Sequence, residues 1–315
     1  MSNRAKGYLM VIFAAIFWGL SGTVAQFLFQ HKGFDAAWLV TMRLIIAGII
    51  LLVFASHDST QSIFTIWRSP RNGYSLLVFG IMGMVGVQYT YFASIQEGNA
   101  AVATLLQYLA PMIIMLYVIS VARKLPSIIE AIALLLALTG IFLLVTNGTI
   151  QGLSVSKAAL IWGILSAVAL AFYTLYPARL LAQFGSATVI GWAMLIGGIV
   201  LSVFRAPWEM EGQVWSFSVL LCVAFIIFFG TLLAFYLYLD SLRYLRATET
   251  SMLATAEPLA AVIASVIWLQ TSFGFYEMLG GLCIMTTVII LAIPQEKKNI
   301  ELSPSLKQKS DPHSL

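Results

Sequence analysis

The chain has 315 residues, of which 60% are hydrophobic and only 10% are charged, and its mean hydropathy is +0.93. Soluble globular domains carry about 25% charged residues, so this composition excludes a water-soluble protein and predicts one whose solvent is lipid. The net charge of +4 comes from basic residues spread over the segments between apolar runs, a distribution that does not indicate nucleic-acid binding.

Apolar stretches long enough to cross about 30 Å of hydrocarbon recur ten times along the chain. We place them near residues 7–28, 35–55, 74–94, 100–121, 126–146, 157–178, 186–204, 216–238, 247–269 and 275–293. Alternation at period two is absent, so these spans are predicted to be helices and not barrel strands. The first stretch follows Arg4 and Lys6 as a signal peptide would, but it is too long for one and nine spans follow, so we interpret it as the first helix.

Basic residues are unevenly divided between the two sides of the membrane. With the N-terminus inside, the cytoplasmic segments hold thirteen Lys and Arg residues and the opposite side holds three. The thirteen are Arg4, Lys6, Arg68, Arg71, Arg123, Lys124, Arg179, Arg243, Arg246, Lys297, Lys298, Lys307 and Lys309, and the three are Lys32, Lys157 and Arg205. The positive-inside rule therefore predicts that both termini are cytoplasmic, in a multi-pass protein of the cell membrane. The polar tail 295–315 is predicted to be disordered.

The two halves of the chain are similar in sequence. Phe34–Phe54 aligns without a gap to Phe184–Phe204, and the matches include Gly48 with Gly198. A second register, offset by 147 residues, pairs Tyr91 with Tyr238, Pro111 with Pro258 and Glu130 with Glu277. Five helices per repeat is an odd number, so the second copy enters the membrane the other way up. The sequence thus predicts an all-α membrane protein of two inverted five-helix repeats, 7–146 and 157–293, whose central site opens to either side.

Short motifs in this order resemble the EamA-type domains of the drug/metabolite transporter superfamily. They are Phe17-Trp18-Gly19 with Ser21, Met42-Arg43-Leu44 followed by Ala47-Gly48, Ala103-Thr104-Leu105-Leu106-Gln107-Tyr108 leading to Pro111, and Glu257-Pro258. The resemblance covers roughly residues 7–293 and implies a secondary carrier, commonly an exporter of amino acids or their derivatives. The chain departs from the family where such domains often carry a Gly-Glu pair, since Arg123 and Gln270 occupy those places.

Five ionisable residues lie inside the predicted spans: Arg43, Glu130, Glu249, Glu257 and Glu277. A charge at the bilayer centre costs at least about 2.5–3.5 kcal/mol, so such residues are candidates for function. Glu130 and Glu277 are equivalent in the two repeats, and each is placed in the first turn of its helix, where it would stabilise the helix dipole. The same structural role is favoured for Glu249. Arg43 and Glu257 instead align with Ala193 and Ala110, so shared architecture does not explain them.

Arg43 lies too deep in its helix to reach water easily, so it requires a carboxylate, carbonyl groups or an anionic part of a substrate. Glu257 directly precedes Pro258, which removes the hydrogen bond to the carbonyl of Ala254 and loosens that turn. Glu257 is therefore a candidate for substrate or proton handling, and the alternative is that it is a buried partner of Arg43.

Polar and aromatic residues deep in other spans complete the candidate site. Gln107 and Tyr108 precede Pro111 as Thr255 precedes Pro258, so the two loosened turns are expected to face each other across the pseudo-twofold axis. An aromatic residue at helical spacing more often serves packing than binding, and that alternative stands for each of them. The candidate substrate-binding or coupling residues are Trp18, Arg43, Gln88, Gln107, Tyr108, Tyr173, Tyr236, Thr255 and Glu257.

Several activities lack their signatures in this chain. There is no Gly-rich Lys-Ser/Thr phosphate loop, no His/Cys metal cluster and no nucleophile–base motif, so neither an enzyme nor a cofactor is expected. The predicted function is secondary active transport of a small metabolite by alternating access, with the lipid bilayer and protons as further partners. The alternative is a non-transporting membrane sensor or assembly partner, which would be expected to carry a sizeable soluble domain.

Overall fold

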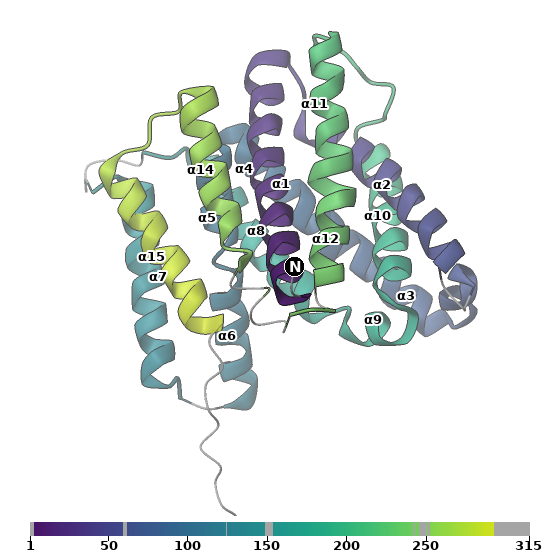
Figure 1. Ribbon diagram of the computed structural model, residues 1–315, viewed down its shortest axis with the longest axis horizontal. Coiled ribbons are helices and arrows are strands. Elements are labelled where there is room, and N and C mark those ends of the chain that lie inside the picture. The colour runs from purple at the N-terminus through teal and green to yellow at the C-terminus, as the bar shows by residue number, and fades with distance from the viewer. Residues whose placement is uncertain are drawn as a thin grey trace, which may run out of the picture.

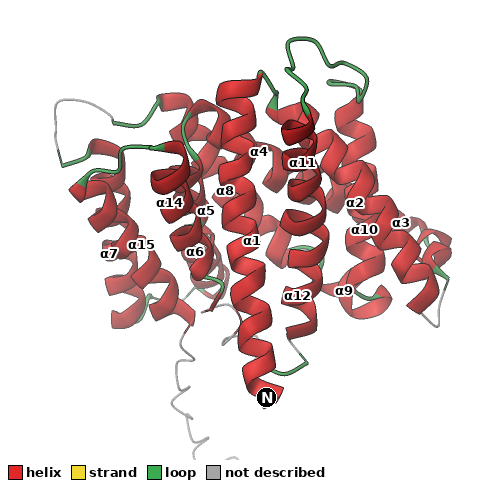
Figure 2. Ribbon diagram, turned by 45° about the horizontal axis from the view of Figure 1, so that its top comes forward, coloured by secondary structure: helices red, strands yellow, loops and turns green. Residues whose placement is uncertain are grey.

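The computed structural model describes residues 3–58, 62–123, 125–148, 154–241, 243–245, 250 and 253–292, and throughout these residues it contains helices and no strands (Figure 2). Eight of the described helical segments are long and apolar enough to cross a membrane, and Ser186–Ser202 and Ala256–Leu269 are two shorter apolar helices. The all-helical prediction is confirmed. Glu249 and the tail 295–315 lie outside the described residues, so the predictions made for them stay predictions.

In the first half, several predicted spans divide into consecutive elements. The elements are α1 (Asn3–Lys32), α2 (Ala36–Asp58), the 3₁₀ helix η1 (Ile63–Arg68), α3 (Pro70–Val78), the π-helix η2 (Phe79–Val85), α4 (Gly86–Glu97), α5 (Ala100–Gln107), α6 (Ala110–Ala122) and α7 (Ile128–Thr146). Polar caps fix the helix starts: the side chain of Asn99 accepts a hydrogen bond from the backbone N–H of Val102, and Ser127 and Glu130 form a capping box.

The second half repeats this pattern. Its elements are α8 (Lys157–Leu175), α9 (Ala178–Phe184), α10 (Ser186–Ser202), α11 (Phe217–Ile227), the π-helix η3 (Phe228–Leu233), α12 (Ala234–Ser241), α14 (Ala256–Leu269) and α15 (Phe275–Ala292). Ser156 and Ser216 cap α8 and α11 in the same way that Asn99 caps α5. In Figure 1, α7 and α15 lie together on one flank and α2 and α10 on the other, with α1, α8 and α12 between them.

Helix α2 packs against α10 through two glycines that the sequence alignment pairs. A Cβ atom on Gly48 would lie 2.7 Å from the backbone nitrogen of Leu195, and one on Gly198 would lie 2.9 Å from that of Ile45. Ile45 and Leu195 are themselves equivalent positions. The contact of Gly48 with Leu195 therefore corresponds to the contact of Gly198 with Ile45. The absence of a side chain at both glycines is what lets the two backbones approach this closely.

Helices α7 and α15 contact each other in a related manner. A Cβ atom on Gly140 would lie 2.8 Å from the carbonyl oxygen of Gly280, and Thr287 donates a hydrogen bond to the carbonyl of Ala133 at 3.3 Å. In the 147-residue register Gly140 is equivalent to Thr287, and Ala133 to Gly280. This second interface thus also joins equivalent positions crosswise.

The structural role predicted for Glu130 and Glu277 is confirmed. Both lie in the first turn of their helices, α7 and α15. The carboxylate of Glu130 accepts a hydrogen bond from the backbone N–H of Ser127 at 2.6 Å, and that of Glu277 accepts one from Gly274 at 2.7 Å. Each side chain therefore stabilises the positive end of a helix dipole.

Arg123 and Gln270, which replace the residues common in the family, adopt a backbone conformation that suits glycine. Both residues end a helix in the left-handed region, with φ angles of 50° and 52°. Glycine enters this region without steric cost, whereas other residues are strained there. The glycine expected from the family is thus explained by backbone geometry at these two helix ends.

Replacing Gly198 with alanine is expected to destabilise the protein by about 1–3 kcal/mol, because the added Cβ atom would overpack the contact between α10 and α2. Thermal unfolding of the detergent-solubilised protein measures the effect. Gly86→Ala is the matched control, since a Cβ atom there would meet only the Cβ of Ala169 at 3.4 Å. Equal melting temperatures for the two variants would contradict this close packing.

Candidate functional site

A cavity of about 980 Å³ occupies the middle of the helix bundle. It extends from there toward the end of the bundle at which α1 begins and α15 ends, here named the N-terminal end. Seven of the nine candidate residues line it: Trp18, Arg43, Gln88, Gln107, Tyr108, Tyr173 and Glu257. They come from α1, α2, α4, α5, α8 and α14 and from the turn after α5, so a single chamber gathers side chains from both halves of the chain.

Two candidates are not brought into this cavity. The side chain of Tyr236 on α12 is 62% exposed, whereas Tyr238, two residues later, lines the chamber together with Phe235. Two residues correspond to about 200° of rotation around a helix, so only one of the two tyrosines faces inward. Thr255 is buried, but it lies in the turn before α14 and does not line the cavity.

The two proline-associated helix breaks meet at the cavity, as the sequence indicates. The first break separates α5 from α6 at Tyr108 and Leu109, and the second lies at Ala254 and Thr255, just before α14. The hydroxyl of Tyr108 donates a hydrogen bond to the carbonyl of Ala254 at 2.6 Å. Pro258 deprives that carbonyl of its usual helical partner, and it accepts from the backbone N–H of Glu257 at 2.9 Å instead. The hydroxyl of Tyr108 gives the second break an additional hydrogen bond from the first.

The same hydroxyl also lies 3.1 Å from Oε2 of Glu257. A phenol has one hydrogen to donate, so the carbonyl of Ala254 and the carboxyl of Glu257 compete for it. A charged carboxylate is the stronger acceptor and attracts that hydrogen. A protonated carboxyl can instead donate to Tyr108, which leaves the hydrogen of Tyr108 to Ala254. The protonation of Glu257 is therefore linked to the bond that stabilises the helix break.

Arg43 is anchored to the π-helical turn η3. Its Nε donates to Oγ1 of Thr231 at 2.7 Å, its Nη2 donates to the carbonyl of Gly230 at 3.2 Å, and its guanidinium carbon lies 5.0 Å from the centre of the Phe92 ring. Thr231 in turn donates to the carbonyl of Ile226. A π-turn disturbs the regular helical bonding of its carbonyl groups, and Arg43 satisfies one of them.

Arg43 and Glu257 both face the cavity, and within the described residues neither forms an ion pair with an acidic or basic side chain. The alternative in which Glu257 is a direct salt-bridge partner of Arg43 is thus not what the structure shows. Arg43 is 5% exposed, and Nη1 is the nitrogen of its guanidinium not engaged by η3. Arg43 and Glu257 therefore border one chamber with opposite charges, and Glu130, whose carboxylate caps α7, also lines it.

Aromatic rings and free amides form a further part of the wall. Trp18 contacts Phe235 and Tyr238 with ring centres 5.3 Å apart in both cases, and Tyr173 lies 5.2 Å from Phe79. Gln88 and Gln107 are buried, yet their amides make no hydrogen bond to any described residue. Since buried polar groups normally have partners, these amides are available to a molecule in the cavity.

Sequence reasoning missed two residues of this site. Ser21 lines the cavity, and its buried hydroxyl has no hydrogen-bond partner in the described part of the chain. Thr231 holds Arg43 but does not stand out in an apolar span. Ser21 belongs to the motif that begins with Phe17, and its position one turn from Trp18 was the signal that could have identified it.

Aromatic and polar contacts gather at the opposite end of the bundle. The rings of Phe34, Trp38 and Trp215 contact one another with centres 5.1–5.7 Å apart. Gln26 accepts a hydrogen bond from the backbone N–H of Ala100, and Gln30 donates one to the carbonyl of Gly98. These contacts join α1, α2 and the start of α5 at the end of the bundle opposite the N-terminal end.

Comparison with known proteins identifies the family of this architecture. The model of the EamA-like transporter family matches residues 5–146 and again 157–293. The chain belongs to this family. It is therefore a multi-pass membrane transporter, and Arg43 and Glu257 lie within the matched residues.

Relatives of this EamA-like transporter include the inner membrane transporter YicL of Salmonella typhimurium, which is 39% identical over 95% of this chain and 99% of its own length. The threonine/homoserine exporter RhtA of Salmonella typhimurium is 25% identical over 95% of this chain and 93% of its own. A crystal structure with 18% identity shares the fold with a TM-score of 0.59 over 91% of this chain and 96% of that one.

Thr231→Val should lower the stability of the protein by about 1–3 kcal/mol, because it removes the acceptor of a buried, charged hydrogen bond from Arg43. The melting temperature of the purified variant measures this loss. Thr286→Val is the control, since the hydroxyl of Thr286 is exposed and bonds only to the carbonyl of Leu282 on its own helix. An unchanged melting temperature for Thr231→Val would mean that Arg43 does not depend on this anchor.

Proposed function

We propose that this EamA-like transporter is a secondary active exporter of amino acids or their derivatives, that it works by alternating access, and that it exchanges substrate for protons. The observation that carries the proposal is the presence of Arg43 and Glu257 on one cavity, neither with an ion partner among the described residues. Burying each charge alone is costly, and a zwitterionic substrate offers a carboxylate to Arg43 and an ammonium group to Glu257.

The neutral part of the cavity also suits such a substrate. The free amides of Gln88 and Gln107 and the hydroxyl of Ser21 supply hydrogen bonds, and the rings of Trp18 and Tyr173 supply apolar surface. A few polar groups in a mostly apolar cavity are typical of small-molecule sites. The distant similarity to RhtA, named as a threonine/homoserine exporter, supports both the substrate class and the direction of transport.

The topology of the proposal has ten spanning helices in two inverted repeats, with both termini in the cytoplasm. The crosswise contacts between α2 and α10, through Gly48 and Gly198, support a pseudo-twofold relation between the halves. The thirteen-to-three division of basic residues supports the orientation. In this topology the N-terminal end of the cavity faces the cytoplasm, which is the loading side of an exporter, and the cluster of Phe34, Trp38 and Trp215 lies toward the other side.

Proton exchange follows from the competition at Tyr108. When substrate binds, its ammonium group favours a charged Glu257, which attracts the hydrogen of Tyr108 away from the carbonyl of Ala254. When a proton returns to Glu257, Tyr108 is free to stabilise the break before α14. Substrate and proton thus act on one carboxyl group in opposite ways, and this is the condition for coupled exchange.

Reconstituted protein is expected to catalyse counterflow of amino acids such as threonine or homoserine. For a transported amino acid, its methyl ester lacks the carboxylate and its hydroxy-acid analogue lacks the ammonium group. Each should compete at least about tenfold more weakly, because one buried charge is left without its partner. Protein-free liposomes are the control. An absence of counterflow for every amino acid and related metabolite tested, or equal competition by the methyl ester, would refute the substrate class.

Glu257→Gln should abolish the stimulation of transport by a pH gradient, because an amide cannot bind and release a proton. The measurement is substrate flux in proteoliposomes with and without the gradient. Glu277→Gln is the matched control: that carboxylate caps α15 outside the cavity, so its loss should leave the pH response in place. Unchanged pH dependence in Glu257→Gln would remove Glu257 from the coupling mechanism.

A further inference from the structure

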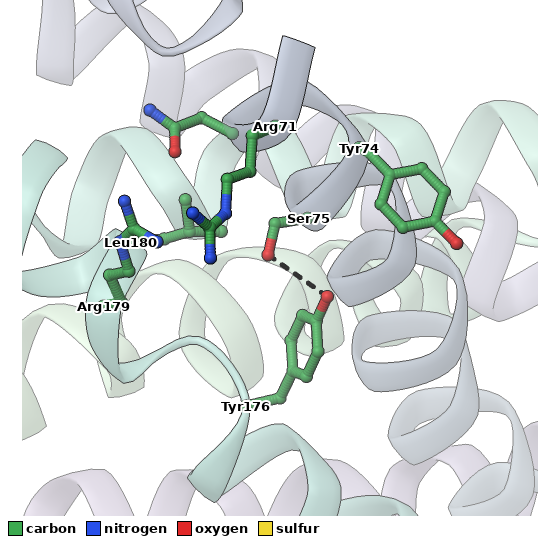
Figure 3. A pocket seen from close by; sticks show the side chains of 7 residues that line it. Arg71, Tyr74, Ser75, Tyr176, Arg179 and Leu180 are labelled. Carbon is green, nitrogen blue, oxygen red and sulfur yellow. Dashed lines mark hydrogen bonds between the residues drawn. The ribbon is translucent and has the colours of Figure 1, made fainter. Parts of the chain in front are cut away.

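A second cavity, of about 270 Å³, lies near the start of α3 and the turn that joins α8 to α9 (Figure 3). Arg71, Asn72 and Ser75 come from α3, and Tyr176 and Arg179 come from the end of α8 and the start of α9. None of these residues lines the large cavity. The site is thus separate from the proposed transport path, although it contacts both halves of the chain.

The charge of this cavity is positive and uncompensated. In Figure 3 the side chains of Arg71 and Arg179 both reach into the hollow, one from each half. No acidic residue lines it, and within the described residues neither arginine forms an ion pair. Both arginines are exposed to solvent, and an anion between their two guanidinium groups would be attracted by both.

Neutral donors complete the lining. Ser75 donates a hydrogen bond to the hydroxyl of Tyr176 at 3.1 Å, so the hydrogen of Tyr176 itself remains for a ligand. Asn72 is 8% exposed, and its amide makes no hydrogen bond to any described residue. The cavity therefore offers two charged groups and two neutral donors to a compact group that carries several acceptor oxygens.

We propose that this cavity binds a phosphate group, either as the headgroup of an anionic phospholipid or as a soluble phosphate. Guanidinium groups bind phosphate oxygens through paired hydrogen bonds. The proposed topology places the cavity at the cytoplasmic surface, where anionic lipids gather and basic residues attract them. Tyr74, which is 71% exposed at the rim, is the residue type that favours the membrane interface.

Occupation of the site would connect the two halves of the protein. The ligand would bridge α3, which continues through η2 toward the large cavity, and the end of α8, which carries Tyr173. The bound anion would therefore hold the N-terminus of α3 to the C-terminal end of α8, and α8 borders the transport cavity. We expect it to raise the melting temperature of the protein.

Binding to the purified full-length protein in neutral detergent tests the proposal. The probes are short-chain phosphatidylglycerol, short-chain phosphatidylcholine as the zwitterionic control, and inorganic phosphate. The variants are the double substitution Arg71→Gln with Arg179→Gln, the milder Tyr176→Phe, and Arg123→Gln as a control that removes an exposed basic residue outside the cavity. The readouts are the dissociation constant and the ligand-induced shift in melting temperature.

The wild type and Arg123→Gln should bind phosphatidylglycerol or phosphate equally well. The double variant should bind at least about tenfold more weakly, and Tyr176→Phe should be intermediate. Preference for phosphatidylglycerol over both other probes assigns a lipid site, and preference for inorganic phosphate assigns a soluble ligand. The proposal is overturned if neither anion binds the wild type, or if Tyr176→Phe and the double variant, melting normally without ligand, keep wild-type affinity.

Discussion

The hydrocarbon interior offers no water to backbone groups, so every departure from regular helix must be satisfied by the protein itself. In this EamA-like transporter, regular α-helix is interrupted at the π-turns η2 and η3 and at the two breaks near Pro111 and Pro258. Side chains compensate for the loss at two of these places: Arg43 binds the carbonyl of Gly230 in η3, and Tyr108 binds that of Ala254. Both side chains also line the large cavity. The polar side chains that satisfy the interrupted helices are thus the same side chains that a substrate in the cavity would contact.

Local patterns of the sequence predict much of this arrangement. Hydropathy predicts the helical spans, proline predicts the breaks, and the first-turn positions of Glu130 and Glu277 predict their capping role. The alignment pairs Gly48 with Gly198, but only the structure shows that each packs against the backbone of the partner helix. The π-turns could not be predicted, because an apolar sequence gives no signal for the one additional residue that such a turn contains. The partnership of Thr231 with Arg43 joins residues 188 positions apart and needs the folded packing.

The two halves share a backbone plan but not a chemistry. Ala193, the equivalent of Arg43, is fully buried among apolar side chains and carries no charge. Ala110, the equivalent of Glu257, lines the cavity without a charge. In the proposed symmetric arrangement the two repeats supply the chamber, and of its ionisable residues Arg43 and Glu257 have no charged equivalent, whereas Glu130 has Glu277. Such a site presents a positive group and a negative group at different places in the chamber, which suits a substrate with one negative and one positive end.

The hydrogen bond that joins the two helix breaks also differs between the two halves. Tyr108 spans from the first break to the carbonyl of the second, and its equivalent in the other half is Thr255. A threonine is much shorter than a tyrosine and cannot make the reciprocal bond across the same gap. If the repeats exchange conformations, as the proposed mechanism requires, the second state is not stabilised by the mirror image of this contact. In the proposed mechanism the two states would then differ in free energy, and protonation of Glu257, whose carboxyl group competes for the hydrogen of Tyr108, would act on that difference.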